Sequence, residues 1–439
     1  MAISASSTDE MQQILITECY LDKKQQVMEN GVGSSRKYDV ILWGASGFTG
    51  SLVAEFLLSR YGVDKELNWA IAGRSEKKLI TLKERLGCIQ VDHLIADSHD
   101  KASLDSLTKQ TKVICTTVGP YAHYGTKLVQ SCIDNSTDYC DLTGEVQWIR
   151  QMIDQYHELA SERGVKIVHC CGFDSIPSDM GVYFFQTEAK KLTGEYLDHI
   201  KFRVRAIKGG VSGGTLASLN NVMEESKQNK DVAQIVREPY SLNPTGMRKG
   251  MDKTDLTRLV FDPDLNEWIS PFVMAGINTK VVRRSHALMN FEYGMTFKYD
   301  EAILNGKGPK GRLKGVGQMA FLGVLLLGGP NTIPGKIISK FMPKPGEGPS
   351  QSERENGFFK IILHGKFEGG SFLRAQVTGD RDPGYGSTSK MLGESAVCLA
   401  KDRKDLPPNY GIITPSIAMG SKLLSRLQEN AGLSFTMLN

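Results

Sequence analysis

The sequence lacks the residue spacings of metal and redox sites. Its eight cysteines form no C-x-x-C pair, and no two of its eight histidines stand four residues apart. Zinc ribbons, thioredoxin-type sites and two-histidine helical sites need those spacings, so no metal site is predicted. Cysteines within apolar runs, such as Cys115, are expected to be buried thiols, and unpaired thiols favour a reducing compartment.

Net charge and long apolar runs are also scarce. The 53 Lys and Arg residues against 49 Asp and Glu give a formal charge of only +4. That is too little for a protein built around nucleic-acid phosphates, so no nucleic-acid partner is predicted. The most apolar stretch, residues 319–329, has roughly half of the ~20 residues that a membrane-spanning helix needs.

The N-terminal residues 1–36 lack targeting features. They contain several acidic residues and no arginine before Arg36, whereas transit peptides are rich in arginine and poor in acids. We predict a disordered or loosely ordered tail and an intracellular, cytoplasmic protein. Peripheral seating on a membrane or lipid droplet through residues 319–329 is the alternative for its location.

Short apolar segments alternate with helical segments six times between residues 37 and 178. Each apolar segment ends in a glycine or a polar turn, which is typical of a parallel sheet covered by helices on both faces. We therefore predict an α/β fold with a Rossmann-type, doubly wound parallel sheet. Its expected strands are 40–43, 69–72, 91–96, 113–118, 139–142 and 165–170.

After residue 178 the pattern changes, and a second, mixed α+β domain is predicted over residues 179–402. Its expected strands are 201–206, 280–284, 291–299, 358–364 and 372–378. A helix is predicted over residues 387–400, with Ser387 or Thr388 as its N-cap. The C-terminal segment 403–439 contains a predicted helix at 415–428 and is expected to pack back on the first domain.

A glycine-rich turn follows the first predicted strand and opens the first predicted helix. It has the spacing G-x-x-G-x-x-G. Glycines let the backbone approach a pyrophosphate, and the helix start supplies unpaired N–H donors. With a strand before it and a helix after it, the turn predicts dinucleotide binding. The predicted binding residues are Gly44, Ser46, Gly47, Phe48, Thr49 and Gly50.

The end of the second predicted strand, Gly73-Arg74-Ser75, favours NADP(H) over NAD(H). NAD-specific sites carry an acidic residue here, which would repel a 2′-phosphate. The Arg74 guanidinium can instead pair with that phosphate. Asp97, at the end of the third strand, is predicted to reach the adenine. The wall beside the nicotinamide ribose is predicted to comprise Val118, Gly119 and Pro120.

Longer motifs carry a family resemblance. The segments YDVILWGASGFTG, AIAGRS, TTVGPYAHYG, DYCDLTGE and CGFDSIPSD resemble the saccharopine dehydrogenase-like oxidoreductases. The later segments VSGGTLAS, NTKVVRRSHAL, PKPGEGPS and TPSIAMG resemble the trans-acting enoyl reductases within that group. The resemblance implies NADP-linked reduction of an enoyl double bond in polyketide, lipid or glycolipid assembly. It also implies an acyl thioester substrate, carried by coenzyme A or an acyl carrier protein.

Four residues are candidates for catalysis. Enoyl reduction needs a proton donor at the α-carbon and a hydrogen bond to the thioester carbonyl, and aspartate or tyrosine can supply either. Asp174 follows the sixth predicted strand, although it could instead cap the next helix. Tyr121 and Tyr124 follow the fourth strand, and Tyr385 stands in a loop of the second domain that could reach the cleft.

Two other functions stay open. A saccharopine-type dehydrogenase of an amino-acid adduct would need cations for a dicarboxylate substrate, which Arg203, Arg205, Arg283 and Arg284 could supply. A lipid-associated scaffold that binds NADP(H) without turnover would use residues 319–329 and the lysines that flank them. A homodimer is a further open prediction.

Overall fold

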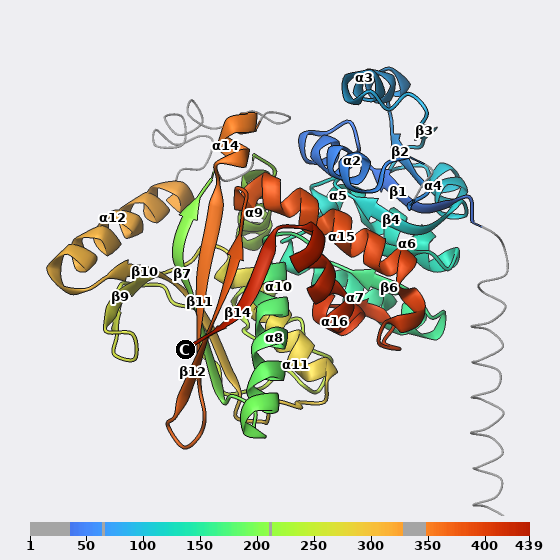
Figure 1. Cartoon of the computed structure of the whole chain (residues 1–439). Helices are drawn as coiled ribbons and strands as arrows, with labels where there is room; N and C mark the ends of the chain where they lie inside the picture. The colour runs from blue at the N-terminus through green and yellow to red at the C-terminus, as the bar shows by residue number, and fades with distance from the viewer. Residues whose placement is uncertain (1–35, 64–65, 210–212, 328–347) are drawn as a thin grey trace, which may run out of the picture.

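The computed structural model describes residues 36–63, 66–209, 213–327 and 348–439. The predicted tail up to residue 35 and the two glycines that end the 319–329 stretch lie outside the described residues. Two seven-stranded sheets, each with its own helices, form the two units of the molecule (Figure 1). None of the described helices combines the length and the apolar content needed to cross a membrane.

The first sheet confirms the predicted Rossmann-type unit. All of its strands pair in parallel, in the order β13-β6-β5-β4-β1-β2-β3. The chain order reverses between β1 and β4, as it does in doubly wound sheets. The strands are β1 (Tyr38–Trp43), β2 (Trp69–Gly73), β3 (Asp92–Ile95), β4 (Thr111–Thr116), β5 (Asp138–Cys140), β6 (Lys166–Val168) and β13 (Gly411–Ile413).

Helices cover both faces of this sheet because its strands are apolar on both sides. In β1, Val40 and Leu42 belong to one buried cluster, and Ile41 and Trp43 belong to the other. The first face packs on α2 (Phe48–Tyr61), α3 (Glu76–Leu86), α15 (Thr388–Lys401) and α16 (Pro415–Asn430). The second packs on α4 (Lys101–Thr108), α5 (Tyr121–Tyr124), α6 (Thr126–Asp134) and α7 (Val146–Glu162).

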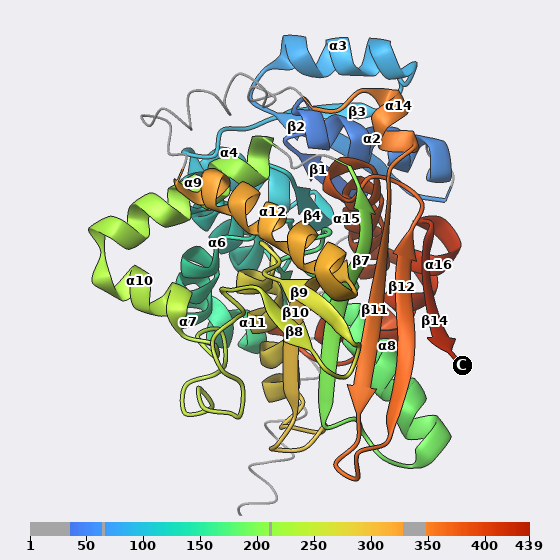
Figure 2. The ribbon, with the colours of Figure 1, turned by 90° about the vertical axis from the view of Figure 1, so that its left-hand side faces the viewer.

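The second sheet is mixed, which confirms the predicted α+β unit. Its order is β14-β12-β11-β7-β10-β9-β8, with β7 and β10 parallel and the other pairs antiparallel. The strands are β7 (His199–Lys208), β8 (Val260–Asp262), β9 (Glu267–Ser270), β10 (Lys298–Gly306), β11 (Phe358–Lys366), β12 (Phe372–Gly379) and β14 (Leu433–Leu438). The long strands β7, β11 and β12 run side by side (Figure 2).

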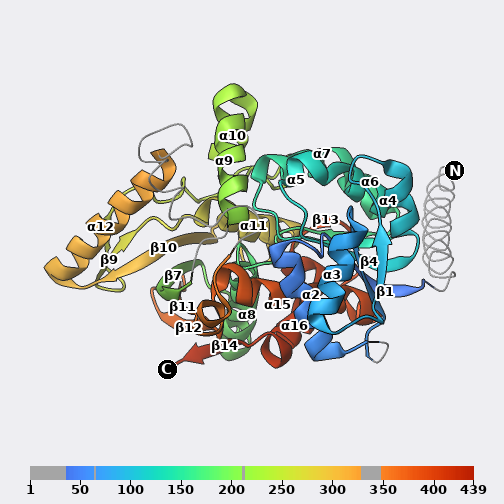
Figure 3. The same ribbon diagram turned by 90° about the horizontal axis from the view of Figure 1, so that it is seen from above.

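The helices of the second unit lie in different places relative to the two sheets. α8 (Ile176–Thr193) and α11 (Ala275–Leu288) pack between the two sheets, whereas α12 (Gly308–Leu327) lies on the outside over β9 and β10. Seen from above, α9 (Gly213–Gln228) and α10 (Lys230–Arg237) project between the two units (Figure 3). The short helix α14 (Gln351–Glu355) stands at the top of β11.

The chain passes between the units more than once. After the second sheet, α15 returns to pack on β1, β4 and β5, and β13 adds a strand beside β6. The final strand β14 then joins the second sheet beside β12. The division into residues 37–178, 179–402 and 403–439 stays a prediction, but in space α15 lies on the first sheet.

Two local predictions are wrong. Residues 280–284 lie in α11 rather than in a strand, because this helix is buried around most of its surface and shows no apolar stripe. Residues 291–297 form turns, with Asn290 and Phe291 at φ 52° and 60°, and the strand begins only at Lys298. Ser387 is confirmed as the N-cap of α15, but its side chain makes no cap bond. Asp382 instead accepts bonds from the backbone N–H groups of Tyr385 and Gly386.

Candidate nucleotide-binding and catalytic site

The predicted site residues of the first unit gather at one edge of the parallel sheet. The turn at Gly44 follows β1, Arg74 follows β2, Asp97 follows β3 and Val118 follows β4. Asp174 comes a few residues after β6. Because all these strands are parallel, their carboxyl ends lie at the same edge, where open α/β sheets bind their ligands.

The glycine turn fits a dinucleotide pyrophosphate. A Cβ at Gly50 would stand 2.2 Å from the carbonyl oxygen of Gly44, so only glycine lets α2 begin this close to β1. Gly44 adopts φ +85°, and a Cβ there would meet Val118 at 2.5 Å. The N-cap of α2 is Gly47, which has no side chain to occupy the first N–H groups. These groups therefore remain available to an anion.

The residues after β2 fit the 2′-phosphate of NADP(H). Arg74 is exposed, and no ion pair holds its guanidinium within the described ranges. Ser75 is the N-cap of α3, and its hydroxyl accepts a bond from the N–H of Lys78 at 3.4 Å. An unpaired guanidinium at a helix start opposes the helix dipole, and a bound phosphate would compensate both charges.

The next two strand ends shape the rest of the edge. The Asp97 carboxylate accepts a bond from the N–H of His99 at 2.8 Å, which fixes the turn beyond β3. The N–H of Val118 donates to the Thr116 hydroxyl at 3.2 Å, and Gly119 and Pro120 continue the chain into α5. Roles for Asp97, Val118, Gly119 and Pro120 in nucleotide binding stay predictions.

The structure separates the two candidate tyrosines of α5. Tyr121 is buried, its hydroxyl donates to the Thr116 carbonyl at 3.2 Å, and its ring stacks on Trp148. Burial raises the pKa of the Tyr121 hydroxyl, which its contacts hold in the turn after β4. A catalytic role for Tyr121 stays a prediction. Tyr124 is half-buried beside the His99 ring, with 5.6 Å between the ring centroids. It therefore lies toward the β3 end of the edge.

Glu145 is a residue of this turn that sequence reasoning did not identify as part of the site. Its buried carboxylate accepts bonds from the N–H groups of Tyr121 and Ala122 at 2.8 and 3.0 Å. It thereby fixes the loop after β4 against the loop after β5. The signal was present in the sequence, since an acidic residue directly follows Thr143-Gly144 at a strand end, but its partner lies 24 residues away in the chain.

Asp174 has the properties of a proton donor. It is half-buried beside Gly144, where a Cβ would stand 3.6 Å from its carboxylate oxygen. Burial raises the pKa of the Asp174 carboxyl to about 7. Within the described ranges its carboxylate has no hydrogen-bond partner, and it does not cap α8, whose N-cap is Ser175 without a side-chain cap bond.

A buried polar chain connects this turn to the second sheet. The Ser175 hydroxyl lies 3.2 Å from the carbonyl oxygen of the Asn278 side chain, whose NH₂ donates to Glu301 at 2.9 Å. The Tyr299 hydroxyl donates to the other Glu301 oxygen at 2.7 Å. Burial raises the pKa of Glu301 to about 7, although the hydrogen bonds from Tyr299 and Asn278 act to lower it. The chain fixes the position of the turn that carries Asp174.

Tyr385 is placed against the glycine turn. Its ring is buried and makes an edge contact with the Phe48 ring, with 4.7 Å between centroids. The loop that carries it is tied to the first unit, because the Thr388 hydroxyl accepts a bond from the N–H of Phe173 at 3.0 Å. Tyr385 therefore contacts the nucleotide side of the edge through Phe48.

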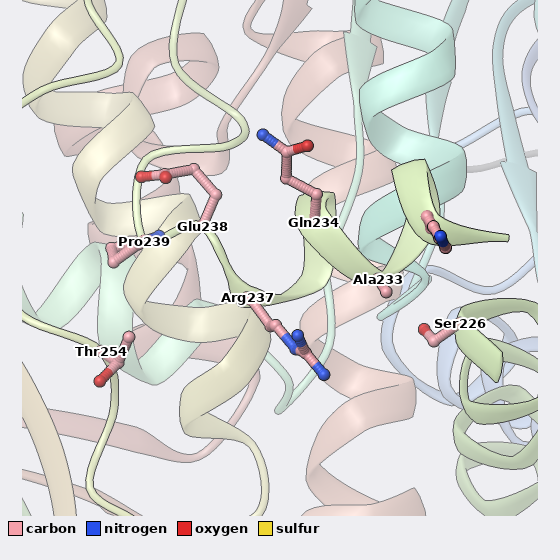
Figure 4. A pocket seen from close by; sticks show the side chains of 8 residues that line it. Ser226, Ala233, Gln234, Arg237, Glu238, Pro239 and Thr254 are labelled. Carbon is pink, nitrogen blue, oxygen red and sulfur yellow. The ribbon is translucent and has the colours of Figure 1, made fainter.

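A hollow of the second unit is separate from these residues. A cavity of about 640 Å³ lies along α10, between α9 and the loop that reaches Thr254 (Figure 4). It contains none of the predicted site residues. Its lining comprises Ser226, Lys230, Ala233, Gln234, Arg237, Glu238, Pro239 and Thr254.

The four arginines that could bind a dicarboxylate substrate are already engaged by acidic side chains or carbonyl oxygens of this chain. Arg203 pairs with Asp262 and Asp300, and Arg205 makes a bidentate pair with Glu267 at 2.8 and 2.9 Å. Arg283 pairs with Asp252 at 2.7 Å. The buried Arg284 donates to the carbonyl oxygens of Leu242 and Ile412 at 2.5 Å each. None of the four is left over for a ligand carboxylate.

Together, the doubly wound sheet, the glycine turn and Arg74 define an NADP-binding oxidoreductase of the Rossmann type. Residues 40–168 match the family model of the saccharopine dehydrogenase NADP binding domain. A trans-acting enoyl reductase of Mycobacterium ulcerans is 34% identical over 416 residues, which cover 90% of this chain and 97% of that protein. A Mycobacterium tuberculosis protein with the provisional name of trans-acting enoyl reductase is 38% identical over 412 residues, covering 91% and 97%.

The chain therefore belongs to the family of these trans-acting enoyl reductases, among the saccharopine dehydrogenase-like oxidoreductases. NADP(H) is its cofactor. Among solved structures, apo saccharopine dehydrogenase (L-Glu forming) of Saccharomyces cerevisiae aligns with a TM-score of 0.48 and 14% identity. That alignment covers 91% of this chain and 99% of the yeast chain.

Proposed function

We propose that this protein reduces the carbon–carbon double bond of an enoyl thioester with NADPH. The observation that carries the proposal is Asp174, a half-buried acid without a described partner at the nucleotide-binding edge of the sheet. The names of relatives that share 34–38% of their residues over nine-tenths of the chain support the same reaction. Bound NADPH would supply a hydride for the β-carbon.

The chain's own residues would do the remaining work. Asp174, whose pKa of about 7 keeps a proton available near neutral pH, would transfer it to the α-carbon as the carbanion character develops there. The backbone around Gly144 would place the thioester beside that carboxyl, since no side chain separates the two. The Ser175–Asn278–Glu301 chain would hold the turn in register during the transfer.

Charge supports an acyl substrate over a dicarboxylate adduct. The four arginines that could bind two carboxylates are all engaged by acids or carbonyl oxygens of this chain. Freeing them would leave buried acids such as Asp262 unpaired, which costs several kcal/mol per broken pair. An acyl chain carries no such charge and needs only apolar walls near the reacting carbons.

Turnover separates these functions. In one assay, purified protein is mixed with NADPH and a 2-enoyl thioester of coenzyme A. In the other, it is mixed with NADP⁺ and saccharopine. The absorbance of the reduced nicotinamide is followed in both. Oxidation of NADPH that depends on the enoyl thioester is the expected result. Turnover of saccharopine, or tight NADPH binding without turnover of any enoyl thioester, would contradict the proposed reaction.

We also propose that α12 makes a peripheral contact with an anionic lipid surface. Gly315 faces the protein, where a Cβ would meet Leu259 at 2.2 Å. The large apolar residues of α12 face outward: Leu313, Val316 and Phe321 are 74%, 52% and 67% exposed. Exposed cations, Lys310, Arg312 and Lys314, flank this stripe. Such a helix, apolar outside with flanking lysines, matches interfacial helices.

Co-sedimentation with liposomes of mixed neutral and anionic lipids tests the contact. We expect Phe321→Asp to reduce the sedimented fraction at least threefold, because a carboxylate would enter the lipid interface. Leu192→Asp, an exposed leucine at the end of α8, is the matched control and should change little. Equal sedimentation of both variants and the wild type would refute the contact and leave the reductase proposal intact.

A further inference from the structure

A cation of the second unit stands at the first turn of α2. Phe48 is the first residue of that helix, directly after the glycine turn. The guanidinium carbon of Arg354 lies 5.6 Å from the centroid of the Phe48 ring. A Cβ at Gly348 would touch the same ring at 2.3 Å, so the segment that carries Arg354 packs directly on it. Figure 2 shows α14 and α2 side by side at the top of the molecule.

Local structure holds Arg354 in this place. Ser350 and Glu353 form a capping box, which stabilises α14 although the helix has only five residues. The carbonyl of Arg354 accepts a bond from the N–H of Asp382 at 3.0 Å, and this ties α14 to the loop of Tyr385. One guanidinium nitrogen donates to the carbonyl of Pro349 at 2.7 Å. The side chain is therefore oriented before any ligand binds.

Most N–H donors of the Arg354 guanidinium have no partner among the described residues. A guanidinium offers five N–H groups, and within the described ranges only the bond to Pro349 uses one. No carboxylate of the described residues forms an ion pair with it. A half-buried cation that is oriented but unpaired, next to a helix start, is suited to a bound anion.

We propose that Arg354 binds the pyrophosphate of NADP(H) from the second unit. The pyrophosphate carries two negative charges, and the glycine turn from Gly44 to Gly50 contains no basic side chain. The helix start supplies N–H donors on one side, and Arg354 supplies a planar pair of donors on the other. The nucleotide thus bridges the two units, and Phe48 with Tyr385 sets the distance between them.

This role differs from that of Arg74 in a measurable way. The 2′-phosphate occurs only in NADP(H), whereas the pyrophosphate occurs in NAD(H) as well. Loss of Arg74 should therefore reduce the preference for NADPH over NADH. Loss of Arg354 should weaken both nucleotides by the same factor and leave the preference unchanged. The inference rests on nucleotide binding at the glycine turn and not on the identity of the substrate.

Titration of the full chain with NADPH and NADH, followed by nicotinamide fluorescence, tests the proposal. We expect Arg354→Met to raise both dissociation constants about tenfold and to make NADPH binding less sensitive to salt. Methionine keeps an apolar stem against Phe48. Arg354→Lys keeps the charge and should stay within about threefold of the wild type. Arg381→Met removes a neighbouring cation that binds the carbonyl of Glu355, and should leave both constants unchanged.

Three outcomes would overturn the proposal. Unchanged dissociation constants in Arg354→Met would show that the guanidinium only packs on Phe48. Loss of NADPH binding alone would place it at the 2′-phosphate instead. Equal weakening by Met and Lys, with a lowered Tm in the absence of nucleotide, would show a role in folding. Failure of the wild type to bind either nucleotide would instead refute the cofactor assignment itself.

Discussion

The two units of the molecule carry their cations in opposite ways. At the edge of the first sheet, Arg74, Lys77 and Lys78 are exposed and form no ion pair within the described ranges. In the second sheet, Arg203 and Arg205 are paired with acids of the same chain. Free cations prepare a surface for an anion from solution, whereas paired cations stabilise the fold and are unavailable to a ligand.

This contrast separates the two ligands of the reaction. The 2′-phosphate of the nucleotide needs the free cations of the first unit, such as Arg74. An acyl chain needs none, and Arg203 and Arg205 of the second sheet are not free to bind one. Asp174, the proposed proton donor, stands where the two units meet, because the turn that carries it is held by Asn278 and Glu301 of the second unit.

The largest effect is expected at Gly50. Gly50→Ala places a Cβ 2.2 Å from the Gly44 carbonyl, so α2 must move away from β1 and the donors of its first turn leave the pyrophosphate. We expect NADPH affinity to fall about 100-fold or more. Gly47→Ala is the matched control, since its Cβ would stand at 3.3 Å from the same oxygen. Fluorescence titration measures both, and equal affinities for the two variants would contradict the account.

Asp174→Asn is expected to have the next largest effect. It removes the proton donor and should lower kcat about 100-fold while NADPH affinity stays unchanged. In the wild type, kcat should fall as pH rises above about 7, because Asp174 then loses its proton. Tyr124→Phe is the comparison, and it should keep most of the activity. An undiminished kcat in Asp174→Asn would remove this residue from the chemistry.

The pH dependence of stability is a second, independent test of the raised pKa of Asp174. Its pKa in the folded state is about 7, well above the value of about 4 in an unfolded chain. The folded protein therefore loses stability as pH rises from about 4 to 7, and the loss persists above pH 7. Asp174→Asn lacks this loss and should raise Tm at pH 8 while changing it little at pH 4. The opposite sign would mean that the carboxylate is paired in solution.

Sequence reasoning succeeded where the chain carries its information locally. The six short apolar segments and the glycine turn are each defined within a few residues, and the first sheet and its binding edge follow from them. It failed at α11, because a helix buried on most sides has no polar face to reveal its period. It could not foresee the partners of Tyr121 and Tyr385, since the contacts with Thr116 and Phe48 depend on tertiary packing. The catalytic roles of these two tyrosines stay predictions.

Other parts of the site depend on contacts between distant segments. Glu301 is one acidic residue in an ordinary strand, and only the fold brings it to Asn278 and so to the turn of Asp174. Arg354 likewise follows an unremarkable capping box, and its approach to Phe48 joins residues about 300 positions apart. Single-sequence patterns do not encode such pairings.

Arg74→Ala should have a moderate and selective effect. The charge-assisted contact with the 2′-phosphate contributes roughly 1.5–3 kcal/mol, so NADPH affinity should fall about tenfold or more while NADH affinity is unchanged. Arg85→Ala removes an exposed cation from the far end of α3 and serves as the control. Titration with both nucleotides measures the ratio. An unchanged preference for NADPH would mean that the free cations of the first edge do not serve the 2′-phosphate.

Arg205→Gln should have the smallest effect on stability and activity. A small effect is what the pairing of the second sheet's cations predicts, so this variant tests the comparison of the two units directly. The Arg205 side chain is 41% exposed and pairs with Glu267, so its removal should lower stability by about 0–1 kcal/mol. A glutamine can still donate one bond to Glu267. If the second unit binds an uncharged acyl region, KM for an enoyl thioester should stay within about twofold of the wild type. A tenfold rise in KM would mean that Arg205 leaves Glu267 to bind substrate, and a dicarboxylate would then become the better substrate for this unit.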